Sequence, residues 1–249
     1  MSTVCKRNPK QENMQNKQLP LPLTYYGLRE IILMPVVFFA LAIVASLIWP
    51  GATIGLLIAA LVLSILGLAF FRDFERAVPD EPNILVAPAD GKVTDICEIE
   101  ESEFIQGQAI RIGIFLSVLD VHVNRIPCGG TVKLIKEKPG KCLNAMRSQD
   151  ASEQNQSTSL GLDCPDHPVG KILVRQITGA IARRIICATN VGDNLVAGQR
   201  YGMIKFGSRT ELYLPKNETA QVLVKKGDTA RGGVTVLVRY GQRSEESGS

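Results

Sequence analysis

The sequence predicts a mainly β (α+β) soluble domain that is preceded by a two-helix transmembrane hairpin. Two observations lead to this fold class: residues 31–71 contain no charged side chain, and residues 84–241 consist of short β-type runs separated by turns. The chain has 249 residues, of which 45% are hydrophobic, so it is long enough for one ordinary domain and a membrane anchor.

The hairpin consists of two apolar runs, Ile31–Trp49 and Ala52–Phe71. Each has the length of about 20 residues that crosses a hydrocarbon core, and neither has the polar stripe of a helix that packs on a soluble core. Only Pro50 and Gly51 separate the runs, so both outer ends must lie on the same side of the membrane.

The charges around the hairpin predict its orientation. The N-terminal segment, residues 1–30, is basic, arginines follow the second run, and the turn between the runs has no charge. By the positive-inside bias, both termini and the soluble domain face the cytoplasm at the cell (inner) membrane. No cleaved signal peptide is expected, because the first run begins only at Ile31 and another span follows at once.

Residues 72–83 are charged and contain two prolines, which is typical of a linker. The soluble domain, residues 84–241, then consists of β-type runs bounded by turn residues, and residues 242–249 are a polar tail. The runs are Gly91–Ile96, Ala109–Phe115, Val121–Ile126, Thr131–Glu137, Lys171–Ile177, Ala182–Ala188, Arg200–Phe206, Arg209–Leu214, Ala220–Val224 and Val234–Arg239.

Two segments of this domain look alike, residues 192–198 and residues 227–233, because each begins with Gly-Asp and has another glycine six residues later. They resemble the turns of lipoyl-like β-sandwiches and predict two related hairpins that close a compact core. Glycine supplies the positive φ angles that such turns need, so these glycines have a structural role.

Other compositional features exclude several classes of function. The six cysteines (Cys5, Cys97, Cys128, Cys142, Cys164 and Cys187) show no C-x-x-C spacing, and the chain has two histidines. We therefore expect free thiols and no metal site. The net charge of +4 is small, and no motif indicates a nucleic-acid partner.

Three motifs identify a family. They are Ala87-Pro-Ala-Asp90-Gly-Lys-Val93, then Phe115-Leu-Ser-Val-Leu-Asp120-Val-His122-Val-Asn-Arg125-Ile-Pro127, and finally residues 201–215 with Gly207-Ser208 in their middle. Their order and spacing match the phosphatidylserine decarboxylases, which are pyruvoyl-dependent membrane enzymes. From about Asp80 to Tyr240 the chain resembles the short bacterial and archaeal form of this family.

The resemblance implies a proenzyme that cuts itself between Gly207 and Ser208. The products are a β chain, residues 1–207, and an α chain, residues 208–249, which form a heterodimer or a higher oligomer. Ser208 becomes a covalent pyruvoyl group, so pyruvate is the cofactor. The group forms a Schiff base with the amine of phosphatidylserine in the membrane, and this carboxy-lyase releases CO2 and phosphatidylethanolamine.

Chemical reasons support this assignment. Decarboxylation of an amino acid leaves a carbanion at Cα that needs an electron sink, and no unmodified side chain is one. The Ser208 hydroxyl can attack the Gly207 carbonyl to form an ester, and β-elimination then leaves a dehydroalanine that hydrolyses to pyruvoyl. Glycine leaves that carbonyl unshielded and tolerates the backbone strain of the attack.

Asp90 and His122 are the other candidate catalytic residues. Asp90 lies in a turn composition, where it either caps its own backbone or, as the family implies, orients a catalytic partner during maturation. His122 is either a structural histidine or the proton donor to the Cα carbanion, and the base for Ser208 is an alternative role.

The chain departs from the long bacterial form of the family, in which a second histidine follows three residues after the first. Arg125 stands there, so the base for self-cleavage stays open. Arg125 and Arg209 are the candidate substrate-binding residues, Arg125 because a guanidinium binds carboxylate or phosphate and Arg209 because it follows Ser208. We expect His167 to be exposed.

Residues 141–168 are polar and almost free of large apolar residues, so we expect them to add little to the core. Two interpretations stay open, a mobile surface loop and a lid beside the active site.

Two rival functions also remain. One is the same chemistry on archaetidylserine, and the other is a non-catalytic, membrane-anchored lipoyl-like binding module, which would stay a single chain and would leave two of the motifs unexplained.

Overall fold

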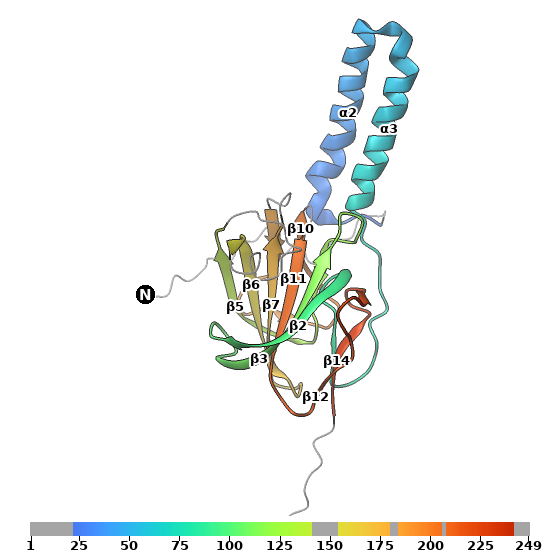
Figure 1. The fold of residues 1–249 in the computed structure, drawn as a ribbon. Helices are drawn as coiled ribbons and strands as arrows, with labels where there is room; N and C mark the ends of the chain where they lie inside the picture. The colour runs from blue at the N-terminus through green and yellow to red at the C-terminus, as the bar shows by residue number, and fades with distance from the viewer. Residues whose placement is uncertain (1–21, 141–153, 180–183, 206–207, 242–249) are drawn as a thin grey trace, which may run out of the picture. The chain divides into compact units, whose positions relative to one another are not determined.

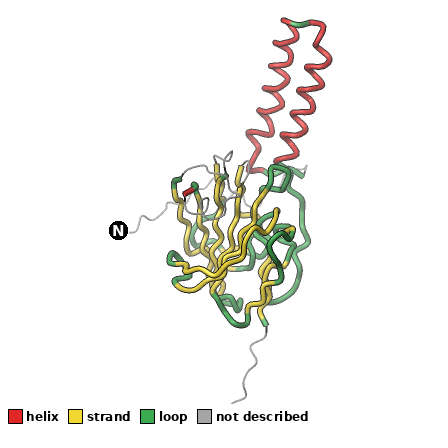
Figure 2. Tube along the Cα trace, in the orientation of Figure 1, coloured by secondary structure: helices red, strands yellow, loops and turns green. Residues whose placement is uncertain are grey.

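A computed structural model of the chain describes residues 22–140, 154–179, 184–205 and 208–241. The chain divides into two compact units, with the boundary between Glu75 and Arg76. The first described unit is helical and the second consists of β-strands (Figures 1 and 2). A mainly β domain with a preceding apolar helical hairpin is the predicted fold class, and the structure confirms it.

The helical unit consists of α2 (Leu28–Ile48) and α3 (Thr53–Phe70), with the short 3-10 turns Tyr25–Gly27 and Pro50–Ala52 before each helix. Both helices are long and apolar enough to cross a membrane. Their large apolar side chains are exposed, with 79% of Leu47 and 75% of Ile54 accessible. Such surfaces are stable in lipid and costly in water.

Small residues let the two helices approach each other. Ala42, Ala60 and Ser64 are the buried residues near the middle of the helices. Gly67 of α3 faces Met34 of α2, and a Cβ at Gly67 would lie 2.8 Å from the Met34 methyl carbon. The Ser64 hydroxyl donates to the Ala60 carbonyl at 2.7 Å, so no polar group of this side chain is exposed to lipid.

The β unit contains three antiparallel sheets. The largest has eight strands in the order β13-β2-β3-β11-β7-β6-β5-β9, and the others are β1-β14-β12 and β4-β10-β8. The strands are β1 (Ile84–Val86), β2 (Gly91–Glu101), β3 (Gly107–Leu116), β4 (Val123–Arg125), β5 (Gly130–Lys138), β6 (Ser157–Cys164), β7 (Gly170–Thr178), β8 (Arg184–Cys187), β9 (Asn194–Leu195), β10 (Arg200–Lys205), β11 (Ser208–Pro215), β12 (Ala220–Val222), β13 (Thr229–Ala230) and β14 (Val236–Tyr240). Each β-type run of the sequence overlaps one of them.

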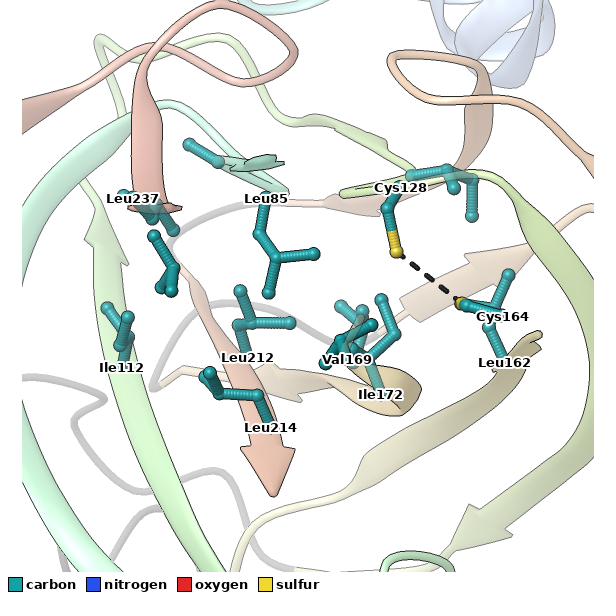
Figure 3. Close-up of a cluster of buried hydrophobic side chains, with 14 of the residues drawn as sticks. Leu85, Ile112, Cys128, Leu162, Cys164, Val169, Ile172, Leu212, Leu214 and Leu237 are labelled. Carbon is teal, nitrogen blue, oxygen red and sulfur yellow. Dashed lines mark hydrogen bonds between the residues drawn. The ribbon is translucent and has the colours of Figure 1, made fainter. Parts of the chain in front are cut away.

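The core lies on one face of the large sheet, where side chains of alternate residues meet those of the smaller sheets (Figure 3). Ile112 of β3 and Leu212 of β11 are fully buried there together with Leu85 and Leu237. Cys128 and Cys164 belong to the same cluster, with their sulfur atoms 3.4 Å apart. Because one face of β11 packs into this core, its other residues point to the opposite face.

The expectation that residues 141–168 add little to the core is wrong for their second half. Strand β6 pairs with β5 and β7, and Leu160 and Leu162 lie in the core. The other face of the strand is covered as well, because Gly161 leaves room for the Phe104 ring, 2.8 Å from where a Cβ would be. Small polar residues therefore occupy a strand that is buried on both faces. Residues 141–153, to which the lid interpretation also applied, lie outside the described residues.

The two Gly-Asp turns have the same local structure. Gly192 and Gly227 both have φ near 97°, and the glycines six residues later have φ of 74° and 75°. In each turn the aspartate carboxylate accepts a hydrogen bond from a backbone N–H three residues earlier, at 2.8 Å for Asp193 and 2.9 Å for Asp228. The prediction of related turns is confirmed.

Candidate active site

Ser208 begins β11, in the middle of the large sheet. It pairs with Leu116 of β3 on one side and with Thr178 of β7 on the other. Its side chain is fully buried, and its hydroxyl makes no hydrogen bond with the described residues. A buried hydroxyl without a partner costs about 1–3 kcal/mol, so it indicates a function or stored strain. Gly207, the other predicted cleavage residue, lies outside the described residues.

Asn124 of β4 connects the three sequence motifs. Its amide nitrogen donates to the Thr210 hydroxyl at 3.0 Å and, more weakly, to the Pro88 carbonyl at 3.5 Å. Its amide oxygen accepts from the Gln176 amide at 2.8 Å. Thr210 lies two residues after Ser208 and therefore on the same face of β11. These contacts hold the first and second motifs against the strand that Ser208 begins.

Sequence reasoning did not find Asn124, Thr210 and Gln176. A weak signal existed for Gln176, because this polar residue stands in an otherwise largely apolar run, and it is only 1% exposed. Its role nevertheless depends on which strands meet, and the sequence pattern does not give that pairing.

His122 directly precedes β4 and is fully buried. Its Nδ1 lies 2.8 Å from the Asp120 backbone carbonyl, which can only accept, so Nδ1 carries a proton, and in the neutral form of the ring the lone pair is at Nε2. The His122 carbonyl accepts from the Ile204 backbone N–H at 3.3 Å. This bond places His122 beside the segment that leads into Ser208.

Asp90 binds Arg76 through both carboxylate oxygens, at 2.5 and 2.8 Å, and also accepts from the Gly232 backbone N–H at 2.8 Å. It stands just before β2, two strands from β11, which corresponds to about 10 Å across the sheet. In the described residues Asp90 therefore holds the start of the linker and a neighbouring turn. Its predicted part in maturation stays a prediction.

Arg125 is 4% exposed, and its guanidinium donates to the Gly198 carbonyl at 3.0 Å. The side chain runs along Gly233, where a Cβ would lie 2.9 Å from Cδ of Arg125. Arg125 thus joins the two Gly-Asp turns, because each turn ends at one of these glycines. Its contact with a lipid carboxylate or phosphate stays a prediction.

Arg209 is fully buried on the face of β11 opposite to Ser208. Its guanidinium forms ion pairs with Asp95 at 2.6 Å and Glu211 at 2.7 Å, and it donates to the Thr94 hydroxyl at 2.5 Å. Burial is the largest single effect on the Asp95 carboxyl and would raise its pKa, but the charge and hydrogen bond of Arg209, the Thr94 hydroxyl and the Arg111 charge together lower that pKa. These contacts give Arg209 a structural role beside Ser208, and its binding to substrate stays a prediction.

His167 is half-buried instead of exposed as expected. Its Nε2 lies 3.2 Å from the Ile84 carbonyl, its Nδ1 accepts from the Val169 backbone N–H at 3.2 Å, and its ring meets Tyr240 edge-on. Burial lowers the pKa of His167, and this effect is larger than the increase caused by the hydrogen bond to the Ile84 carbonyl. These contacts indicate a structural role for His167. In the part of the chain with assigned structure, no group of three His, Cys, Asp or Glu side chains could hold a metal ion.

Comparison with known proteins agrees with the motifs. The family model for phosphatidylserine decarboxylase matches residues 63–238. The chain belongs to the phosphatidylserine decarboxylase family. This is a family of carboxy-lyases. A phosphatidylserine decarboxylase proenzyme of Rhodopirellula baltica is 44% identical over 223 residues, which cover 89% of this chain and 90% of the relative.

Two further members of the family illustrate its range. The phosphatidylserine decarboxylase proenzyme of Carboxydothermus hydrogenoformans is 47% identical over 186 residues, covering 75% of this chain and 84% of the relative. That of Anaplasma phagocytophilum is 37% identical over 201 residues, covering 80% and 86%. The similarity thus extends over most of each protein and includes the strands that surround Ser208.

Proposed function

We propose that this chain is a proenzyme that cuts itself between Gly207 and Ser208 and then decarboxylates phosphatidylserine to phosphatidylethanolamine and CO2. The observation that supports this most strongly is the Ser208 hydroxyl, which is buried and has no partner among the described residues. In a member of this family, an unpaired buried hydroxyl at the start of a central strand suits a nucleophile better than a structural serine.

Maturation begins when the Ser208 hydroxyl oxygen attacks the Gly207 carbonyl carbon. The amide bond becomes an ester and the Ser208 nitrogen becomes a free amine. Elimination across Cα and Cβ then releases the Gly207 carboxylate and leaves a dehydroalanine, and water converts this group to pyruvoyl with loss of ammonia. Neutral His122, with its lone pair at Nε2, is a suitable base for the hydroxyl proton.

The proposed α chain stays bound after cleavage because of where its first strand lies. Strand β11 is paired over eight residues with β3 and over six with β7, and both neighbours belong to the β chain. Backbone hydrogen bonds on both sides thus hold the new chain end in place. This arrangement favours a stable heterodimer of residues 1–207 and 208–249.

The site fits a pyruvoyl group at residue 208. Ser208 is enclosed by the sheet and by the contacts of Asn124, so a carbonyl formed there stays away from bulk water. Once formed, the group supplies the electron sink for the carbanion that loss of CO2 creates. His122 then returns a proton to the substrate Cα.

The helical hairpin suits a substrate that remains in a bilayer. We propose that it holds the protein in the cell membrane with both ends on the cytoplasmic side, as the basic flanking residues indicate. The headgroup chemistry is the same for ester-linked and ether-linked serine lipids, so archaetidylserine is a second substrate to compare.

The test is release of labelled CO2 from carboxyl-labelled phosphatidylserine in mixed micelles. We expect activity for the wild-type protein and none for Ser208→Ala, which also stays uncut. Ser208→Cys is the matched control, because a thiol can attack the same carbonyl and give partial cleavage. Release of CO2 by Ser208→Ala at the wild-type rate would contradict the proposal.

A further inference from the structure

Gln176, like Ser208, carries a buried polar atom without a partner among the described residues. Its side chain is 1% exposed, and its amide oxygen makes no hydrogen bond with the described residues. The amide nitrogen lies 2.8 Å from the Asn124 amide oxygen and 3.4 Å from the Ile186 carbonyl. Both neighbours are acceptors, so the nitrogen must face them and the oxygen must point elsewhere.

The position of Gln176 on the sheet relates it to Ser208. Gln176 of β7 stands directly opposite Thr210 of β11, and Ser208 stands opposite Thr178, two residues further along. Directly opposed residues share a face, so Gln176 and Ser208 are diagonal neighbours on the same face. Diagonal neighbours lie about 7–8 Å apart between Cα atoms, which is within reach of a long side chain.

The Gln176 oxygen is an acceptor and therefore needs a hydrogen-bond donor. In a phosphatidylserine headgroup the carboxylate and the phosphodiester only accept hydrogen bonds, whereas the amine donates. The amine is also the group that must come close to residue 208. The chemistry of the headgroup thus leaves a single match for this buried oxygen.

We propose that Gln176 binds the amine of the lipid headgroup through its side-chain oxygen and directs that amine at residue 208. Asn124 is a positioning residue in this arrangement, because its amide oxygen fixes the orientation of the Gln176 amide. This inference rests on the proposed function, since it assumes a reactive carbonyl at residue 208.

The test separates amine binding from reactivity of the carbonyl. Mature protein is incubated with dihexanoyl phosphatidylethanolamine and cyanoborohydride, and the mass of the 208–249 chain reports covalent capture of the amine. In a parallel reaction, borohydride reduces the ketone directly and adds two hydrogen atoms without any amine. The ratio of the two rates isolates recognition of the amine.

We expect Gln176→Met to cleave itself completely and to be reduced by borohydride at the wild-type rate. Its capture of the amine should be about 10- to 100-fold slower, since a hydrogen bond to a charged group is lost, and its KM for phosphatidylserine should rise. Gln176→Glu is the matched variant. Burial raises the pKa of a carboxyl, so lowering the pH to 5.5 favours the protonated form, whose OH donates to Asn124 while its carbonyl oxygen remains an acceptor. There we expect capture close to the wild-type rate.

Each outcome has a defined meaning. If Gln176→Met captures the amine as fast as the wild type, or if it fails mainly in self-cleavage, the inference is overturned. If Gln176→Met does not fold, loss of capture by folded Gln176→Glu at pH 5.5 overturns it as well. A wild-type protein that stays uncut contradicts the proposed function instead, because no reactive carbonyl then exists for either reaction.

Discussion

The buried charges beside Ser208 allow a quantitative prediction for Arg209→Met. The substitution removes a guanidinium that is fully buried between Asp95 and Glu211, and Glu211 itself has no exposed surface. Removing one partner of a buried ion pair costs about 3–5 kcal/mol, because the remaining charge is left in a poor solvent. For a domain of this size, each kcal/mol shifts the melting temperature by about 2–4 °C, so a loss of about 6–20 °C follows.

Arg239→Met is the matched control for this experiment. Arg239 and Glu81 form an ion pair with the same N–O distance, 2.6 Å, but their side chains are 48% and 49% exposed. Exposed pairs contribute about 0–1 kcal/mol, so the control should melt within a few degrees of the parent. The two arginines thus have the same shortest N–O distance to a carboxylate but differ in burial.

The assay is thermal unfolding followed by circular dichroism in detergent at pH 7 and a fixed heating rate. Both substitutions are made in the Ser208→Ala background, so that every sample is one uncut chain. Adding Glu211→Leu to Arg209→Met should recover part of the loss, because it removes a buried carboxylate that has lost its nearest guanidinium and keeps Arg111 only at 3.9 Å. Equal melting temperatures for Arg209→Met and Arg239→Met would show that the buried ion pairs of Arg209 do not stabilise the fold more than an exposed pair does.

Three further predictions concern other parts of the chain. Gly113→Ala should destabilise the protein by about 1–3 kcal/mol in denaturant unfolding, because a Cβ at Gly113 would collide with the Arg209 guanidinium. The control is Gly107→Ala on the same strand, where a Cβ meets open space and stability should not change. The pKa of Asp95 in the folded protein lies below its ordinary value of 3.8. Ionised Asp95 therefore stabilises the fold above that pH, and this contribution is lost as the pH falls through the folded-state pKa. Asp95→Asn should make the free energy of unfolding less dependent on pH below about 4, and an unchanged acid transition would count against the ion pair. An alkaline phosphatase fusion at Gly51 should be active and a green fluorescent protein fusion there dark, since the turn faces outward; the reverse pattern would exclude the proposed orientation.

The elements that the sequence predicted are those whose signal is local. Short β-type runs bounded by turn residues located strands such as β3 and β11, and glycine with aspartate located the paired turns. The two apolar runs likewise needed only length and the absence of charge. The motifs around Ser208 identified the family because their residues are close together in sequence.

The features that the sequence did not predict depend on contacts between distant segments. Strand β6 was missed because its small polar residues are acceptable only where Phe104 and the neighbouring strands cover them. The contact of Asn124 with Gln176 and Thr210 joins three strands that are far apart in the chain. Arg209 was expected at the substrate because it follows Ser208, but successive residues of a strand point to opposite faces, which places it in a buried ion-pair network.

The proposed function requires that the chain converts itself into a two-chain enzyme with a carbonyl at residue 208. Intact mass spectrometry of the purified protein, before and after reaction with hydroxylamine, detects both the cleavage and the carbonyl. We predict two chains, residues 1–207 and 208–249, of which only the smaller has no free N-terminal amine and gains one hydroxylamine with loss of water. A single chain of 249 residues that does not react with hydroxylamine would rule out self-cleavage at Ser208.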